Sequence, residues 1–263
     1  MKPATDYSKP AKQRLDVEML GRGLTESREK AQALILAGDV YVDGQKALKP
    51  GQVVTASTQI RVNQPLKYVS RGGLKLEAAL DRFHISVAGR VCMDVGTSTG
   101  GFADCLLQRG APRIHCVDTG VGQIDWKLRT DPRIVLHEKT NARYLEPAMI
   151  GEQPGLIVCD VSFISVTLIL PAVTPILAPG GELVILVKPQ FEVGRDFVGK
   201  GGIVRDAAQQ HRACERVAAA LESLGFAMEL MESPILGMEG NREFLLHGWR
   251  RSPENTKVAG PSR

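Results

Sequence analysis

The sequence lacks the features that mark secreted, disulfide-bonded and membrane-spanning proteins. Its 263 residues contain five cysteines, an odd number without CxxC spacing, which disfavours both a disulfide framework and a zinc ribbon and is typical of a reducing cytoplasm. The longest apolar stretch, residues 164–178, is interrupted by two threonines and two prolines, whereas a membrane helix needs about 20 apolar residues. The first residues have no apolar core of a signal peptide. We therefore expect a cytoplasmic protein without stable membrane association.

A large excess of either charge is also absent, but the small excess is unevenly placed. The chain has 33 Lys+Arg against 29 Asp+Glu, and residues 1–70 hold 11 basic and 7 acidic side chains, while residues 71–263 hold 22 of each. Hydrophobic content of 43% with 24% charged residues is ordinary for globular proteins, so wholesale disorder and fibrous classes are disfavoured. The charge distribution predicts a small basic module, suited to a nucleic-acid partner, joined to a larger neutral domain.

The hydrophobic pattern changes near residue 65. Before it, apolar residues at helical spacing predict two helices, and three short β-prone runs around Val40, Val53 and Ile60 predict a small hairpin sheet with a turn at Asp43-Gly44. After it, short apolar runs alternate with helical stretches, notably 165–177 and 206–224, which predicts a parallel sheet covered on both faces. The seven expected strands lie near 91–95, 113–117, 134–137, 156–159, 183–187, 227–235 and 243–250, the last two as an antiparallel pair at one edge.

A glycine-containing loop follows the first of these seven strands. In residues 94–102, DVGTSTGGF, the glycines let the backbone turn sharply and approach a ligand. Asp118 ends the second strand, 22 residues after Gly96, where a carboxylate can accept hydrogen bonds from a ribose. The loop matches neither the dinucleotide GxGxxG pattern nor a phosphate loop, and its acidic start suits a cationic, amino-acid-bearing nucleoside such as S-adenosylmethionine. The alternative interpretation is that these are only turn glycines and a strand-end aspartate.

Four ionisable side chains lie at strand or helix ends of the large domain. Asp160 follows the fourth strand, Lys188 follows the fifth, Glu243 opens the last, and Lys75 lies on the helix before the first. Ligands in open α/β sheets gather at the carboxyl ends of the strands, so we expect Asp160 and Lys188 beside the glycine loop. A partly desolvated lysine near carboxylates can orient a hydroxyl or help to deprotonate it. Each residue alone could be a solvated charge, but their joint placement favours a site.

Several motifs occur in an order that is typical of one family. The small domain contains Arg14-Leu15-Asp16, Ser27-Arg28, Val42-Asp43-Gly44 and Lys49-Pro50-Gly51, and the large one contains SRGGLKL at 70–76, the glycine loop, DVSFIS at 160–165, KPQFE at 188–192 and GNREF at 240–244. Residues 14–62 resemble the RNA-binding domain of ribosomal protein S4, and residues 68–250 resemble the FtsJ-like Rossmann methyltransferases. In this order the two domains resemble the TlyA family, the hemolysin-named ribosomal RNA 2′-O-methyltransferases.

The resemblance implies an α/β fold and a domain plan. We expect a Rossmann-like methyltransferase with a mostly parallel seven-stranded sheet whose last strand is antiparallel, preceded by a small α+β RNA-binding domain. The expected boundaries are a flexible leader (1–12), the S4-type domain (13–63), a linker (64–74), the methyltransferase domain (75–250) and a flexible tail (251–263). The implied reaction is the transfer of a methyl group from S-adenosylmethionine to a cytidine ribose 2′-hydroxyl of ribosomal RNA.

The resemblance also implies roles for individual residues. In the catalytic set, Lys188 positions the 2′-hydroxyl and helps to deprotonate it, Asp160 and Glu243 hold Lys188, and Lys75 completes the network on the ribose side. No metal is expected, since the five histidines are scattered. The expected cofactor site comprises Asp94, Gly96, Thr97, Ser98, Gly100, Gly101, Phe102, Asp118, Asn141 and Asp160. The basic residues expected to contact RNA are Arg14, Arg22, Arg28, Lys30 and Arg71, with phosphate contacts supplying affinity but little sequence reading.

Two other functions remain as alternatives. A membrane-active hemolysin is suggested by the family's name, but the sequence shows no spanning helix and no cationic amphipathic segment. A catalytically silent RNA-binding protein is disfavoured by the intact set of two lysines and two carboxylates. The expected partner is ribosomal RNA or a ribosomal subunit, and a monomer is the favoured state.

Overall fold

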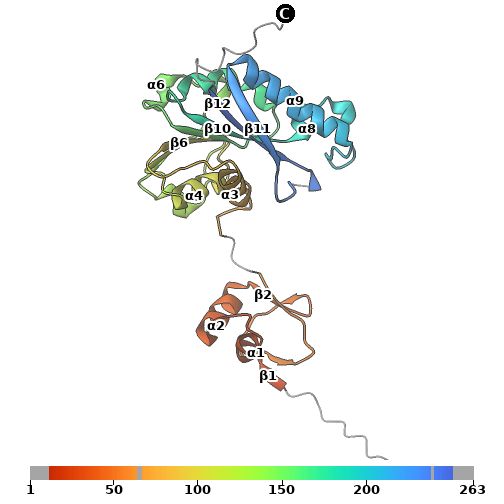
Figure 1. Cartoon of the computed structure of the whole chain (residues 1–263). Coiled ribbons are helices and arrows are strands. Elements are labelled where there is room, and N and C mark those ends of the chain that lie inside the picture. Colours follow the sequence, from red (N-terminus) through yellow and green to blue (C-terminus); the bar gives the residue numbers. More distant parts are fainter. Residues whose placement is uncertain (1–11, 64–66, 238–239, 251–263) are drawn as a thin grey trace, which may run out of the picture. The chain divides into compact units, whose positions relative to one another are not determined.

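The computed structural model describes residues 12–63, 67–237 and 240–250. The chain forms two compact units, Met1–Leu66 and Lys67–Arg263, and several of their elements are labelled in Figure 1. The expected leader up to residue 11, the expected tail and residues 64–66 of the expected linker lie outside the described residues. Lys12 already belongs to a strand and Gly72 to a helix, so ordered structure begins slightly earlier in each unit than the expected domain boundaries. None of the helices in the described ranges combines the length and the apolar character that a bilayer crossing requires.

The first unit contains the two expected helices and the hairpin sheet. Helix α2 begins after Ser27, whose hydroxyl accepts a hydrogen bond from the backbone N–H of Lys30, and ends at Gly38 in the left-handed region, a common pair of helix-capping devices. Strands β2 and β3 are joined at Asp43-Gly44, where both residues have positive φ, as a two-residue hairpin turn of the primed type requires. The elements are β1 (Lys12–Arg14), α1 (Leu15–Gly21), α2 (Arg28–Ala37), β2 (Val40–Val42), β3 (Gln45–Lys46), β4 (Val53–Thr55) and β5 (Ile60–Val62).

One pairing in this unit differs from the expected hairpin sheet. The three-stranded sheet has the order β3-β2-β5, whereas β4 pairs separately with β1, with Gln13 opposite Val54. The sequence of β1 is Lys-Gln-Arg and all three residues are exposed, so no hydrophobic alternation marks it as a strand. The pairing is produced by tertiary contact, because the buried core that holds α1 against β4 includes Leu15 and Val54.

The second unit is built on a seven-stranded sheet in the order β11-β12-β10-β9-β6-β7-β8. All neighbouring strands are parallel except at β12, which is antiparallel to both β10 and β11. This confirms the predicted mostly parallel sheet with an antiparallel pair at its edge. The strands are β6 (Val91–Val95), β7 (Arg113–Val117), β8 (Ile134–His137), β9 (Leu156–Cys159), β10 (Glu182–Val187), β11 (Phe226–Glu232) and β12 (Phe244–Arg250).

Helices cover both faces of this sheet, so the side chains of its central strands are mostly apolar and buried. Helices α3 and α4 pack on one face around a core that includes Leu76, Leu80 and Leu106, while α7 and α9 cover the other face, an arrangement visible in Figure 1 for α3, α4 and α9. The α-helices of this unit are α3 (Gly72–Arg82), α4 (Gly101–Gln108), α5 (Trp126–Arg129), α6 (Pro147–Ile150), α7 (Leu170–Val173), α8 (Pro189–Glu192) and α9 (Ala207–Ser223).

The predicted helical stretch 165–177 is broken into three short pieces. It contains the 3-10 turns η2 (Val166–Leu168) and η3 (Thr174–Ile176) on either side of α7. Pro171 and Pro175 each lie within the first residues of a piece. Proline lacks a backbone N–H and clashes with the preceding helical turn, so a continuous helix cannot pass through either position. Two further 3-10 turns are η1 (Ala142–Tyr144) and η4 (Arg195–Phe197).

The topology brings the expected functional residues to one edge of the sheet. Strands β6, β7, β9 and β10 are parallel, so the glycine loop, Asp118, Asp160 and Lys188 all follow their carboxyl ends. Strand β12 runs the other way, and Val187 pairs with Phe244. Lys188 directly follows Val187, and Glu243 directly precedes Phe244. Both residues therefore lie at the same edge of the sheet.

Candidate active site

The glycine loop makes contacts that only glycine allows. Gly96 has a φ of +86°, and a Cβ atom there would lie 2.5 Å from the backbone oxygen of Asp160. Gly100 has a φ of +94°, and its Cβ would lie 2.3 Å from a methyl carbon of Leu128. Gly96 lies in the wall of a pocket, whereas Gly100 packs against the segment around α5. The first glycine thus shapes the ligand site, and the second lets the loop pack against its neighbour.

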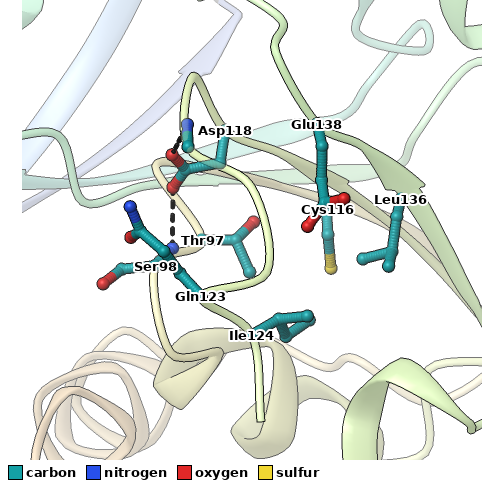
Figure 2. A pocket seen from close by; sticks show the side chains of 9 residues that line it. Thr97, Ser98, Cys116, Asp118, Gln123, Ile124, Leu136 and Glu138 are labelled. Carbon is teal, nitrogen blue, oxygen red and sulfur yellow. Dashed lines mark hydrogen bonds between the residues drawn. The ribbon is translucent and has the colours of Figure 1, made fainter. Parts of the chain in front are cut away.

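Asp118 ties this loop to the end of β7. One carboxylate oxygen accepts the backbone N–H of Ser98 at 2.8 Å, and the other accepts that of Gly120 at 2.7 Å. Figure 2 shows this carboxylate beside Thr97 and Ser98, with Gln123 and Ile124 on the facing loop. A carboxylate oxygen has two lone pairs, so each can accept a second hydrogen bond from a ligand hydroxyl. The position agrees with the ribose contact expected for Asp118, which stays a prediction.

Asp94 lies beneath the loop and not in a pocket wall. Its side chain is fully buried, and one oxygen accepts the backbone N–H of Ala103 in α4 at 3.1 Å. Burial, and then the negative charges of Asp160 and Asp118, raise the pKa of Asp94 well above its usual value. This aspartate therefore fixes the start of α4 relative to β6, and its expected place in the cofactor site stays a prediction.

Two adjoining pockets lie at the carboxyl edge. The larger has a volume of about 550 Å³, and its wall includes Gly96, Asp118 and Asn141 together with apolar side chains. The second, of about 270 Å³, is lined by Thr97, Gly101 and Phe102 from the loop and by Arg71. Three residues belong to both walls, and they are Ser98, Asp160 and Ser162.

All four expected catalytic residues line the second pocket. Lys75 and Glu243 form an ion pair in which both side chains are almost fully buried. Lys188 forms an ion pair with Asp160 at 2.5 Å and donates a hydrogen bond to the Ser162 hydroxyl at 2.8 Å. The four residues thus lie together as expected, but their pairing differs from the expected one, because Glu243 pairs with Lys75 and not with Lys188; their catalytic roles stay a prediction. The antiparallel β12 carries Glu243 to the edge, where its carboxylate meets α3.

Ser162 is a pocket residue that the sequence analysis missed. It lies two residues after the strand-end Asp160, lines both pockets and contacts Lys188. The available signal was its position in a loop directly after a parallel strand, where ligand contacts concentrate. Ser70, Thr99 and Gln123 also line these pockets without having been predicted. No cluster of three or more histidine, cysteine or acidic side chains in the described ranges could hold a metal ion.

The basic residues of the first unit are engaged within that unit. Arg14 donates two hydrogen bonds to Asp16, at 2.9 and 3.0 Å, and Arg28 and Gln32 donate one each to the same carboxylate. Asp16 is fully buried, whereas Arg14 and Arg28 remain about half exposed. Arg14, followed by Gln32 and Arg28, lowers the pKa of Asp16 below its usual range against the opposing effect of burial. Both arginines help to hold the fold of this unit through Asp16, and the phosphate contacts expected of them stay a prediction.

Arg22 and Lys30 have ion-pair partners other than Asp16. Arg22 pairs with Glu18 and donates to the backbone oxygens of the turn at 55–58. Lys30 pairs with Glu26 on the surface. Arg71, in the second unit, lines the pocket that holds Lys188. The role of these residues in RNA contact stays a prediction.

We expect Asp16→Ala to lower the free energy of unfolding of the first unit by about 2 kcal/mol, because hydrogen bonds to a charged group contribute about 1.5–3 kcal/mol to stability. The measurement is hydrogen exchange of α1 and α2 amides in the full chain, with Glu26→Ala, which removes an exposed pair, as the matched control. The pKa of Asp16 is lower in the folded chain than in the unfolded chain. Asp16 therefore stabilises the fold at pH values above its unfolded-state pKa, and this stabilisation is lost as the pH falls from that pKa toward the folded-state one. Equal exchange in both variants would contradict this structural role.

Comparison with known proteins gives two family matches and close relatives. The sequence matches the FtsJ-like methyltransferase family over residues 68–250 and the S4 domain over residues 13–60. The 16S/23S rRNA (cytidine-2′-O)-methyltransferase TlyA of Mycobacterium tuberculosis is 45% identical over 242 residues, which cover 91% of this chain and 90% of the relative. Hemolysin A of Brachyspira hyodysenteriae is 43% identical over 89% of this chain and 98% of its own length. The solved structure of a hemolysin-named protein from Streptococcus thermophilus, 44% identical, superposes with a TM-score of 0.71 and covers 93% of this chain and 90% of that one.

Proposed function

Because the chain belongs to the FtsJ-like methyltransferases, and within them to the TlyA family with its S4 domain, we propose that it transfers a methyl group from S-adenosylmethionine to a ribose 2′-hydroxyl of ribosomal RNA. The observation that carries this proposal is the joint placement of Lys75, Asp160, Lys188 and Glu243 in one pocket beside the glycine loop. The TlyA relatives with curated names act on cytidine, and cytidine is the nucleotide that we propose for this chain.

The residues of the larger pocket fit S-adenosylmethionine. Gly96 leaves space that a side chain would fill, and Asp118 has lone pairs available for ribose hydroxyls. Apolar side chains of the same wall, among them Val117 and Ile169, suit a base, and Asn141 offers an amide. Asp160 supplies negative charge where the two pockets adjoin. When bound, the cofactor supplies an electrophilic methyl group on a positively charged sulfur.

The residues of the second pocket suit the acceptor hydroxyl. Lys188 would hold the ribose 2′-oxygen and assist the removal of its proton, while Asp160 and Ser162 keep the lysine nitrogen in place. The Lys75–Glu243 pair would provide a second, fixed set of charges on the ribose side. Holding two reactants in near-attack geometry can contribute about 7–11 kcal/mol, and proton transfer adds about 10²- to 10⁴-fold in rate. We therefore assign most of the rate enhancement to positioning.

The first unit would bring the RNA to this site. An S4 domain with exposed guanidinium groups at Arg14 and Arg28 suits phosphate contacts, which give affinity and salt dependence but little base specificity. We infer that the small domain docks on folded ribosomal RNA by shape and charge, and that the large domain selects the ribose to be methylated.

Label transfer to ribosomal RNA tests this function. The full chain is incubated with methyl-labelled S-adenosylmethionine and, in parallel, small subunits, large subunits, intact ribosomes and deproteinised ribosomal RNA. The expected product is 2′-O-methylcytidine, identified by nuclease digestion and mass spectrometry. Label on a base would contradict the proposed acceptor, and the absence of label in every RNA, with cofactor binding demonstrated by calorimetry, would contradict the function.

A further inference from the structure

A buried glutamate, Glu192, follows Lys188 by four residues and lines neither of the two pockets. Glu192 ends α8, which starts directly after Lys188, and its side chain is 3% exposed. Its carboxylate accepts the hydroxyl of Ser165 at 2.5 Å and the backbone N–H of Val166 at 2.8 Å. Glu192 therefore joins the segment that carries Lys188 to the far end of the loop that starts at Asp160.

That loop is held at its two ends and exposed in the middle. At its start, the backbone N–H of Asp160 donates to the oxygen of Val95 at 2.9 Å. In its middle, Phe163 is 93% exposed and has a φ of +65°, a conformation that side-chain-bearing residues rarely adopt. Its ring contacts Phe191 with 5.5 Å between centroids. A loop with this backbone strain keeps its shape only when the surrounding structure restrains it, and Glu192 supplies the restraint at the far end.

The two contacts of the Lys188 ammonium that are seen among the described residues both lie on this loop. Asp160 and Ser162 approach it at 2.5 and 2.8 Å. The position of the loop therefore sets the position of the lysine nitrogen. We propose that Glu192 is a positioning residue for Lys188, acting through the loop from Asp160 to Ser165; this inference rests on the methyltransferase function proposed above.

Glu192 has a second property that makes the idea testable. Burial raises the pKa of Glu192, and glutamine has nearly the same shape as this side chain but carries no charge. In Glu192→Gln the amide oxygen can accept from Val166, and the amide N–H can donate to the Ser165 hydroxyl, which then donates to Thr167, its neighbour at 2.7 Å. The restraint survives in this variant and is lost in Glu192→Ala.

The experiment compares steady-state methyl transfer by full-length variants. We expect Glu192→Ala to lower kcat about 10- to 100-fold, the range that a displacement of about 1 Å can cause. The KM for RNA and the Kd for S-adenosylmethionine should change little, because Glu192 touches neither pocket. Glu192→Gln should restore most of the lost kcat, and Ser165→Ala should lower it to an intermediate value.

Glu182→Ala is the matched control for a merely structural effect. Glu182 opens β10, the strand that Lys188 follows. Its carboxylate is partly buried and, like that of Glu192, is hydrogen-bonded on two sides, by His247 and Arg90. Its loss should lower the melting temperature with little effect on kcat. If Glu192→Ala aggregates, Ser165→Ala against the same control carries the test.

A coupling measurement completes the design. Ser162→Ala removes one of the two loop contacts of Lys188, so its effect on kcat should be much smaller in a Glu192→Ala background than alone, because residues that act through one unit are not additive. The positioning role would be overturned if Ser162→Ala lowered kcat by the same factor in both backgrounds. It would also be overturned if the kcat of Glu192→Ala matched that of the Glu182→Ala control. Failure of the wild-type chain to transfer methyl groups would instead overturn the proposed function itself.

Discussion

Replacing Lys188 by methionine should reduce methyl transfer by about 10³-fold or more while leaving the binding of S-adenosylmethionine intact, since removing a proton-transfer group costs about 10²- to 10⁴-fold and lost orientation adds to it. Methionine has a similar length and no charge. It keeps the apolar stem of the side chain beyond β10 but removes the nitrogen that contacts Asp160 and Ser162. The loss should appear in kcat, because this nitrogen would act on the reacting hydroxyl and not on the docking of the RNA.

Lys200→Met is the matched control for a lost lysine charge. Lys200 is exposed in the segment between η4 and α9, and no ion pair of this side chain is seen among the described residues. The measurements are single-turnover methyl transfer and calorimetric cofactor titration for both variants. General-base assistance usually contributes at least about 10²-fold in rate. If Lys188→Met retained more than about a tenth of the wild-type rate, this role would be excluded for Lys188.

The arrangement of strands was predictable because apolar runs and turn residues carry it. The seven runs between Val91 and Arg250 became the seven strands, and the antiparallel edge followed from two runs joined by a short turn. The broken helix at 165–177 was predictable in principle from Pro171 and Pro175, since both residues forbid a continuous helix. Strand β1 was not, because Lys-Gln-Arg has no strand signal and its pairing with β4 is a tertiary contact.

The grouping of four expected residues in one pocket was predictable, and their contacts were not. Resemblance gave Lys75, Asp160, Lys188 and Glu243, and the parallel strands explain why Asp160 and Lys188 meet. The Lys75–Glu243 pair joins residues 168 positions apart, and it depends on the register of β12 against β10, which no local pattern specifies. Glu192 was missed for the same reason, since its partners Ser165 and Val166 lie 27 and 26 positions away, whereas the position of Ser162 after a parallel strand was an available signal.

Two of the basic residues of the first unit have a structural role in addition to the RNA contacts expected of them. The sequence places an excess of basic residues there, which favours a nucleic-acid partner. In the structure Arg14 and Arg28 converge on the buried Asp16 from different elements, so they stabilise the module that they would also help to dock. A variant of either arginine therefore needs a stability measurement beside any RNA-binding measurement.

Gly96→Ala should weaken the binding of S-adenosylmethionine by about 100-fold or more, because two costs combine at this position. The first is the left-handed backbone, which costs a side-chain-bearing residue about 1–2 kcal/mol. The second is steric, since the new Cβ would lie 2.5 Å from the backbone oxygen of Asp160 and 3.2 Å from the Cα of Val161. Both neighbours belong to backbone that cannot rotate away, so either the glycine loop or the strand-end segment must shift. Either shift deforms the wall that the two pockets share.

Gly89→Ala separates these two costs. Gly89 has a φ of +75°, close to that of Gly96, and a Cβ there would meet no atom within 4 Å. Both variants should therefore lose a similar backbone contribution to stability, but only Gly96→Ala should lose the cofactor. Calorimetric titration gives the Kd, and thermal unfolding of the ligand-free chains gives the stability. A Kd that rises equally in both variants would mean that backbone strain alone accounts for the effect, and the close approach of Gly96 to Asp160 would then have no part in shaping the cofactor site.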